Sequence, residues 1–131
     1  MIKQLNKKDF DKFNFEYKRG NMIIIDLGED GIRGSEQRGI RPCVVIQNNM
    51  GNKFSPTLII APITSQINSK KKLPTHVEIN KSKYTLNEDS MILSEQIKVV
   101  SKERCIAYMG ELECSDMDRL NRALAISIGL V

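Results

Sequence analysis

The chain has 131 residues, with 20 lysines and arginines against 16 aspartates and glutamates, and this length predicts a single domain around one core. The net charge of +4 permits a polyanionic partner without requiring one, and three cysteines without CxxC spacing indicate neither a disulfide framework nor a zinc site. The first residues lack the apolar core of a signal peptide, and no apolar run reaches the roughly 18 residues that span a bilayer, so a cytoplasmic protein is expected.

The chain begins with an aromatic-rich segment. Residues 1–18 hold four of the seven aromatic side chains, among mixed charges. Because disordered tails are usually poor in aromatic residues, this segment is predicted to pack against the rest of the chain.

Six short apolar runs follow, and turn-forming residues separate them. Each has the length and residue types of a β-strand, and they lie at residues 22–25, 43–46, 57–63, 75–79, 91–93 and 97–100. Pro62 in the third run suggests a sheet edge or a bulge. Many short strands with turns between them predict a small barrel or sandwich, not alternating βα units.

The C-terminus changes to a helical period. One apolar face of the expected helix consists of Met117, Leu120, Leu124 and Ile128. Ser115 and Asp118 fit a capping box at its start. This face is expected to pack into the core.

The segment from Gly34 to Pro42 carries the most chemistry. It places the polar side chains of Ser35, Glu36, Gln37 and Arg41 on a glycine-hinged loop that runs directly into an apolar strand. The proline holds the preceding arginine extended and suits the start of a strand. A polar loop anchored to a buried strand is a common way to present functional groups, although an ordinary solvated loop has the same composition.

Familiar catalytic motifs are absent. His76, the only histidine, lies on an alternating strand without the partners of a catalytic triad, and the chain has no phosphate-binding glycine loop and no clustered metal ligands. Metal-free phosphoryl transfer on RNA remains feasible, because the 2′-OH of the substrate is then the nucleophile. Arg41 can hold the phosphate as charge builds, Thr64 can add a hydroxyl donor, and Glu36 is a possible base.

Further short motifs follow one another along most of the chain. They are Lys18-Arg19-Gly20, Gly34-Ser35-Glu36-Gln37, Arg41-Pro42, Val45-Ile46-Gln47-Asn48, Ser55-Pro56-Thr57, Ala61-Pro62-Ile63-Thr64-Ser65, Leu73-Pro74-Thr75-His76-Val77-Glu78-Ile79, Asp89-Ser90 and Glu95-Gln96-Ile97. In this ordered set the chain resembles the MazF/PemK family of toxin endoribonucleases, particularly members from Gram-positive bacteria. The resemblance implies a toxin domain over residues 18–131, preceded by an N-terminal extension over residues 1–17.

The resemblance implies a mainly β fold, a small SH3-like β-barrel of the CcdB/MazF/PemK type with a C-terminal α-helix, working as a homodimer. It implies a ribosome-independent, metal-independent and sequence-specific endoribonuclease, an mRNA interferase, from a type II toxin–antitoxin module that arrests growth. Attack by the 2′-OH would cut single-stranded RNA and leave 2′,3′-cyclic phosphate and 5′-OH ends, with no cofactor. The implied partner is a cognate MazE-like antitoxin with an acidic, initially disordered tail.

The resemblance also assigns roles by position. Arg41 and Thr64 match the catalytic pair, and Glu36 matches an acidic loop residue implicated in catalysis or RNA binding. The matches to RNA-contacting positions are Ser35, Gln37, Ser65, Gln66, Leu73, Pro74, Thr75, His76, Glu95 and Gln96. His76 is expected to be a base-stacking or packing residue in preference to an acid–base group.

The chain departs from the family pattern at several positions. Ser94 stands where an aliphatic residue is expected, a departure that should leave activity intact. Residues 28–31 lack the usual proline, and this change in the loop could shift which RNA sequence is cut. The alternative function is that of a non-enzymatic, gyrase-binding toxin of the same fold, which acts through its C-terminal helix. Such toxins lack the arginine and threonine pair, and retention of that pair also argues against a catalytically dead RNA-binding barrel.

Overall fold

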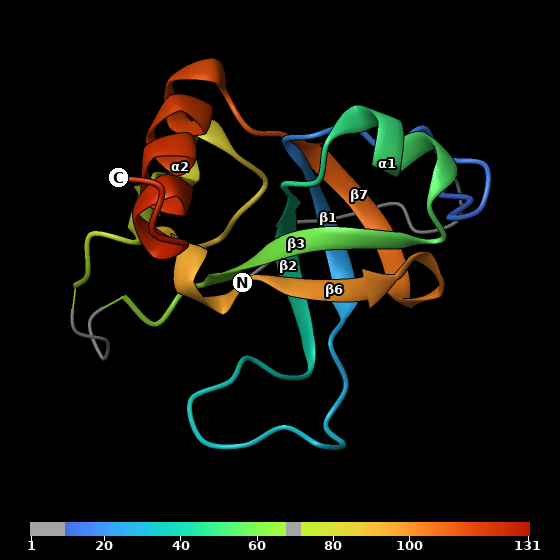
Figure 1. Cartoon of the computed structure of the whole chain (residues 1–131), viewed down its shortest axis with the longest axis horizontal. Helices are drawn as coiled ribbons and strands as arrows, with labels where there is room; N and C mark the ends of the chain where they lie inside the picture. Colours follow the sequence, from blue (N-terminus) through green and yellow to red (C-terminus); the bar gives the residue numbers. More distant parts are fainter. Residues whose placement is uncertain (1–9, 68–71) are drawn as a thin grey trace.

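The computed structural model describes residues 10–67 and 72–131, which form one antiparallel sheet and a C-terminal helix (Figure 1). The strands are β1 (Asn21–Asp26), β2 (Ile40–Val45), β3 (Thr57–Thr64), β4 (His76–Ile79), β5 (Ser90–Leu93), β6 (Lys98–Ser101) and β7 (Cys105–Glu111). The helices are α1 (Asn49–Phe54) and α2 (Cys114–Ser127), with single 3-10 turns η2 (Lys81–Lys83), η3 (Ser94–Gln96) and η4 (Lys102–Arg104). The mainly β fold class with a C-terminal helix is confirmed.

All six predicted strands are present, whereas β7, α1 and the three 3-10 turns were not predicted. The buried residues of β7 are Cys105, Ala107 and Met109. These residues are weak strand formers, so the search for apolar runs did not predict this strand. Residues 48–52 belong to the turn-forming residues between the second and third predicted strands. They begin α1 instead, because the side chain of Asn48 accepts the N–H of Gly51 at 2.8 Å and caps the helix.

The sheet order is β4-β5-β3-β2-β1-β7, and β6 pairs with β3 beside this path. Among the described residues the pairing does not close from β7 back to β4. Successive residues of β1 point to opposite faces. Met22 and Ile24 therefore join an apolar cluster that includes residues of α2, while Ile23 and Ile25 join a second cluster on the other face. The single core expected from chain length is thus two clusters separated by the sheet.

One edge of β3 has two partners in succession. Ile63 and Thr64 pair with β5, whereas residues 57–60 pair with β6. The turn η3 joins these two partners and interrupts the ladder at this point. Pro62 lies in the interrupted stretch of an interior strand, where its missing N–H leaves no ladder bond unmade on that side.

The C-terminal helix buries Leu120 and Leu124 as predicted, whereas Ile128 remains 59% exposed. The predicted capping box is wrong: Glu113 is the N-cap residue, and it makes no side-chain capping bond. The carboxylate of Asp116 instead accepts from the Tyr84 hydroxyl at 2.5 Å and pairs with Arg119 at 2.9 Å. No helix of the described chain is both long and apolar enough to cross a membrane.

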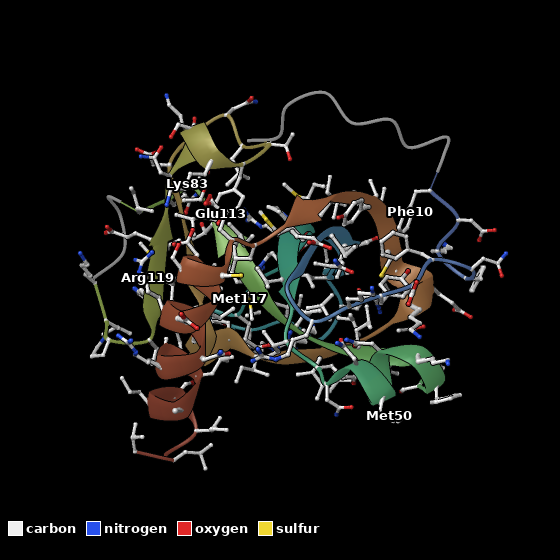
Figure 2. All side chains as sticks on the ribbon, turned by 90° about the horizontal axis from the view of Figure 1, so that it is seen from above. Phe10, Met50, Lys83, Glu113, Met117 and Arg119 are labelled. Carbon is white, nitrogen blue, oxygen red and sulfur yellow. The ribbon has the colours of Figure 1, made fainter. Side chains whose placement is uncertain are left out.

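Residues 10–17 pack against the sheet, as predicted, and residues 1–9 lie outside the described part. Phe15 contacts Phe10, Tyr17 and Tyr108 through tilted or edge-on rings 4.9–5.1 Å apart. Tyr17 is only 3% exposed and belongs to the second apolar cluster. Figure 2 shows Phe10, with Met50 of α1, on the side of the molecule away from α2.

Candidate active site

Arg41 and Thr64, the pair expected to carry catalysis, lie on neighbouring strands. The antiparallel register of β2 and β3 pairs Cys43 with Pro62. Continued by two residues in each strand, this register sets Arg41 opposite Thr64, with both side chains on the face that holds Cys43. Arg41 is half-buried and Thr64 is 1% exposed. Sheet pairing therefore brings together two residues that α1 and most of β3 separate in the sequence.

A backbone contact orients the guanidinium of Arg41. Its Nε donates to the carbonyl oxygen of Arg38 at 3.0 Å, and none of the ion pairs among the described residues includes it. Burial raises the pKa of the Cys43 thiol, while the Arg41 and Lys98 charges act in the opposite direction. Two cations therefore lie near this part of the sheet, and Arg41 is not neutralised by a salt bridge to Glu36.

The hydroxyl of Thr64 is placed to donate. Its Oγ1 accepts the backbone N–H of Gln66 at 3.2 Å, which closes a short turn after β3. Because the oxygen is the acceptor in that contact, the hydroxyl proton stays available for a second partner. Thr64 can therefore close this turn and still donate its hydroxyl proton to another group.

The loop between β1 and β2, residues 27–39, extends away from the body of the sheet (Figure 1). Two backbone bonds close its base: Leu27 donates to Gly39 at 2.8 Å, and Gly39 donates to Gly28 at 2.9 Å. Gly28 and Gly39 have φ of 79° and 74°, in the left-handed region that favours glycine. These glycines define how the loop leaves and re-enters the sheet.

Side chains from outside the loop tether it to the sheet. The amide Nε2 of Gln96 donates to the carbonyl oxygen of Ser35 at 3.1 Å. The ammonium of Lys98 donates to the carbonyl oxygen of Leu27 at 3.3 Å. The loop is therefore held against η3 and the start of β6.

A pocket of about 290 Å³ lies between the loop, β3 and η3. It is lined by Leu27, Glu36, Gln37, Ile60, Pro62, Glu95, Gln96, Ile97 and Lys98. Ile60 and Pro62 share their face of β3 with Thr64, so the pocket adjoins the row of side chains that holds Arg41 and Thr64. The structure thus gathers four predicted site residues, Glu36, Gln37, Glu95 and Gln96, around one cavity.

His76 and Glu95 form a close pair beside this pocket. The imidazole Nε2 lies 2.8 Å from Glu95 Oε2, and the Thr75 hydroxyl donates to Glu95 Oε1 at 3.1 Å. The backbone N–H of Leu73 donates to Nδ1 of His76 at 3.2 Å. The His76 side chain is 3% exposed, so its ring is packed inside the protein.

The remaining predicted residues lie further out. Leu73 and Pro74 are exposed before β4, and Ser65 and Gln66 follow Thr64 at the end of β3. None of these four lines the pocket. They flank residues 68–71, which lie outside the described part of the chain.

Sequence reasoning missed Lys98 as a pocket residue. It pairs with Ile60 across the β3–β6 ladder, so its stem covers the face that holds the second apolar cluster. The strand alternation carries a usable signal, because Lys98 shares a face with the buried Val100. A lysine at an inward-facing strand position is unusual enough to indicate a role for its charge.

The site shows no arrangement for a metal ion. Within the described ranges, no three histidine, cysteine or acidic side chains are grouped so that they could hold one.

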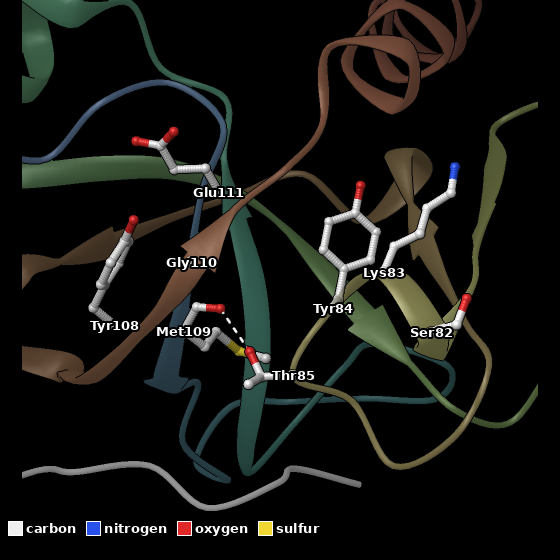
Figure 3. Close-up of a pocket in the computed structure, with 8 residues that line it drawn as sticks. All are labelled: Ser82, Lys83, Tyr84, Thr85, Tyr108, Met109, Gly110 and Glu111. Atoms are coloured by element: carbon white, nitrogen blue, oxygen red, sulfur yellow. Dashed lines mark hydrogen bonds between the residues drawn. The ribbon is translucent and has the colours of Figure 1, made fainter.

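A second pocket, of about 590 Å³, opens beside β7 (Figure 3). It is lined by Ser82, Lys83, Tyr84, Thr85, Tyr108, Met109, Gly110 and Glu111. The Thr85 hydroxyl donates to the Met109 carbonyl oxygen at 2.8 Å and ties its two walls together. It includes none of the predicted site residues, so the smaller pocket beside Arg41 and Thr64 is the candidate active site.

Comparison with known proteins identifies the family of the chain. Residues 18–128 match the family of PemK-like, MazF-like toxins of type II toxin–antitoxin systems. Endoribonuclease MazF of Staphylococcus saprophyticus is 51% identical over 113 residues, which cover 86% of this chain and 92% of the relative. The family resemblance inferred from the ordered motifs is therefore confirmed.

Solved structures share the fold at lower identity. MazF of Deinococcus radiodurans has a TM-score of 0.72 and 18% identity, with 88% of this chain and 99% of that chain covered. A mycobacterial endoribonuclease solved in complex with its cognate antitoxin has a TM-score of 0.71 and 23% identity, with 88% and 97% covered. On the family match and the close relative together, the chain belongs to the PemK-like, MazF-like toxins of type II toxin–antitoxin systems.

Proposed function

We propose that this toxin is a metal-independent endoribonuclease that cuts single-stranded RNA at a short sequence. The observation that carries the proposal is the β2–β3 register, which ends with Cys43 paired to Pro62 and, continued, puts Arg41 and Thr64 on one face beside a polar pocket lined by Glu36. A cation, a hydroxyl donor and a carboxylate are the groups that RNA transesterification needs when the substrate supplies its own nucleophile.

The reaction forms a bond between the 2′ oxygen and phosphorus and breaks the bond from phosphorus to the 5′ oxygen. Arg41 stabilises the charge that builds on the non-bridging oxygens, and Thr64 donates a hydrogen bond to the same group. Glu36 is the candidate base for the 2′-OH proton. Arg41 is assigned to charge stabilisation alone, because a guanidinium does not readily give up a proton.

The attacking and leaving oxygens stand roughly in line through the phosphorus, on opposite sides of it. Glu36 therefore serves one of them only, and another group or a water molecule protonates the 5′ oxygen. The products are a 2′,3′-cyclic phosphate and a 5′-OH.

The proposal includes a homodimer. An apolar groove of about 450 Å³ lies between β3, the β6 side of the sheet and α2, and its lining includes Ile59, Ile97, Leu124, Ile128 and Leu130. Ile128 and Leu130 leave much of their surface exposed at its rim. Two copies that met there would bury this surface.

The second proposed partner is an antitoxin, which would meet the toxin in the cytoplasm. An acidic, disordered segment that ordered on binding would compete with RNA for the cations near the pocket, Arg41 and Lys98. The mycobacterial structural neighbour, solved with its cognate antitoxin, supports this proposal by its fold.

The test is cleavage of a long single-stranded RNA in EDTA, with the new 5′ ends mapped. We expect cuts at one recurring short motif with 5′-OH ends, and a large loss of cutting with Arg41→Ala. Arg122→Ala is the charge-matched control, because Arg122 is exposed on α2 away from the pocket. Intact RNA from a folded wild-type dimer would overturn the enzyme proposal and favour the gyrase-binding alternative, which topoisomerase binding would then test.

A further inference from the structure

We propose that His76 is a positioning residue that fixes the carboxylate of Glu95 as an acceptor in the pocket, and that this carboxylate selects an RNA base with an exocyclic amino group against uracil. The inference rests on the proposed ribonuclease function and assigns one part of its sequence specificity.

The contacts of His76 define its tautomer. The backbone N–H of Leu73 can only donate, so Nδ1 of His76 is the acceptor in their 3.2 Å contact. The ring proton therefore lies on Nε2 and is donated to Glu95 Oε2 at 2.8 Å. Because both nitrogens are used and the side chain is 3% exposed, His76 acts through Glu95 and not on RNA directly.

Two rigid elements set the position of this pair. His76 is the first residue of β4 and lies opposite Leu93 of β5 in the ladder. The backbone N–H of Ser94 donates to the Thr75 carbonyl oxygen at 3.0 Å, which carries the pairing into η3. Strand pairing therefore holds Glu95 next to the imidazole ring. A site held by strands is more precise than one on a free loop.

The carboxylate of Glu95 keeps acceptor capacity for a ligand. One oxygen receives the His76 N–H and the other receives the Thr75 hydroxyl, which leaves further lone pairs on both. No lysine or arginine of the described chain pairs with it. Lys98, which lines the same pocket, donates to the carbonyl oxygen of Leu27 instead. The pocket thus presents a fixed acceptor that no cation of the described residues satisfies.

An ionised carboxylate only accepts hydrogen bonds, so it prefers a base edge that donates. Adenine, cytosine and guanine each carry an exocyclic amino group. Uracil offers only a ring N–H between two carbonyl oxygens, whose lone pairs face the carboxylate unfavourably. Glu95 therefore disfavours uracil at the position that enters the pocket.

The test uses an RNA library with random bases around the cleavage site and compares cutting by the wild type and variants. We expect uracil to be disfavoured about tenfold at one position, the order of a single readout contact, and Glu95→Gln to remove that preference while other positions keep theirs. His76→Leu should relax the same position, and His76→Gln, whose amide can still donate, should restore part of the selectivity. Glu78→Gln is the matched control, because Glu78 pairs with Lys72 outside this pocket.

Binding of uncleavable 2′-O-methyl RNA oligomers, measured by fluorescence anisotropy, separates the two proposals. Selective binding that Glu95→Gln abolishes, in a protein that cuts nothing, would support the inference and overturn the proposed function. An unchanged base profile with Glu95→Gln, or an equal loss for all sequences, would overturn the inference while cutting by the wild type upholds the function. Failure to bind any oligomer overturns both, and circular dichroism checks that each variant is folded.

Discussion

Gln96 and Ser35 are joined by a 3.1 Å hydrogen bond from the Gln96 amide to the Ser35 carbonyl oxygen, across 61 residues of sequence. This bond ties η3 to the loop that carries Glu36 and ends next to Arg41. Gln96→Glu keeps the size of the side chain and removes the donor. We expect RNA cleavage to fall about fivefold, because one hydrogen bond contributes about 1 kcal/mol and the loop then samples other positions. Single-turnover kinetics measure the loss, and hydrogen exchange over residues 33–38 should rise with it. Full activity with unchanged exchange would contradict the tether.

Two substitutions at Thr64 separate the effect of its hydroxyl from the effect of its side-chain shape. Thr64→Val is nearly isosteric at a buried position and removes the donor, so the cleavage rate should fall about 10²-fold, the size of effect seen when a preorganised donor is removed. Thr64→Ser keeps the hydroxyl and should retain most of the rate. Equal activity of the two variants would mean that cleavage does not need the Thr64 hydroxyl.

Tyr17 lies just before the region that matches the family, yet it is buried in the second apolar cluster. Tyr17→Ala should lower the free energy of unfolding by about 3 kcal/mol, as truncation of a buried aromatic does. Phe13 is 68% exposed, so Phe13→Ala is the control and should change it by less than about 0.5 kcal/mol. Urea denaturation measures both. A small effect of Tyr17→Ala would show that the extension is only loosely attached.

Tyr17 also predicts how stability depends on alkaline pH. Burial, with a smaller effect of the neighbouring Cys105, raises its pKa above the ordinary tyrosine value. Above about pH 10 the unfolded chain releases the phenolic proton that the folded chain keeps, so stability is complete below that pH and falls as pH rises, by up to about 1.4 kcal/mol per pH unit for this group. Tyr17→Phe should be less stable at neutral pH, because the Lys12 carbonyl oxygen loses its 2.8 Å bond, but should lose stability less steeply between pH 10 and 11. Denaturant titrations at both pH values measure how steeply the free energy of unfolding falls in each protein. An identical fall in the wild type and in Tyr17→Phe would show that Tyr17 is not the group responsible.

Ser94 departs from the aliphatic residue expected at its position, and its hydroxyl is buried without a hydrogen-bond partner in the described chain. Ser94→Ala removes this unsatisfied group and should raise the free energy of unfolding by about 1 kcal/mol. Thermal unfolding should show a higher Tm with an unchanged RNA cleavage motif. A lower Tm would mean that the hydroxyl has a partner, such as a buried water molecule.

The strands and α2 could be predicted because their signal is local. Apolar residues at period 2 or at helical spacing must bury one face, and this requirement is met within a few neighbouring residues. The start of α2 was misplaced because Asp116 bonds Tyr84, a distant residue that no local capping pattern includes. β7 was not predicted, because its inward residues are buried through pairing with β1 and have little preference of their own for a strand.

By itself, the sequence determined the order of the strands along the chain, the family and the residues with suitable chemistry, because each of these is written in residue types and their spacing. Tertiary structure alone decided which of those residues meet. The register of β2 and β3, continued beyond its last pair, puts Arg41 and Thr64 on one face of neighbouring strands. The interruption between β5 and β6 lets Glu95 and Gln96 line the pocket beside the loop. The place of Lys98 in the pocket and the inward packing of His76 depend in the same way on strand pairing and burial. Such contacts join residues far apart in sequence, and a local pattern contains no information about the register that brings them together.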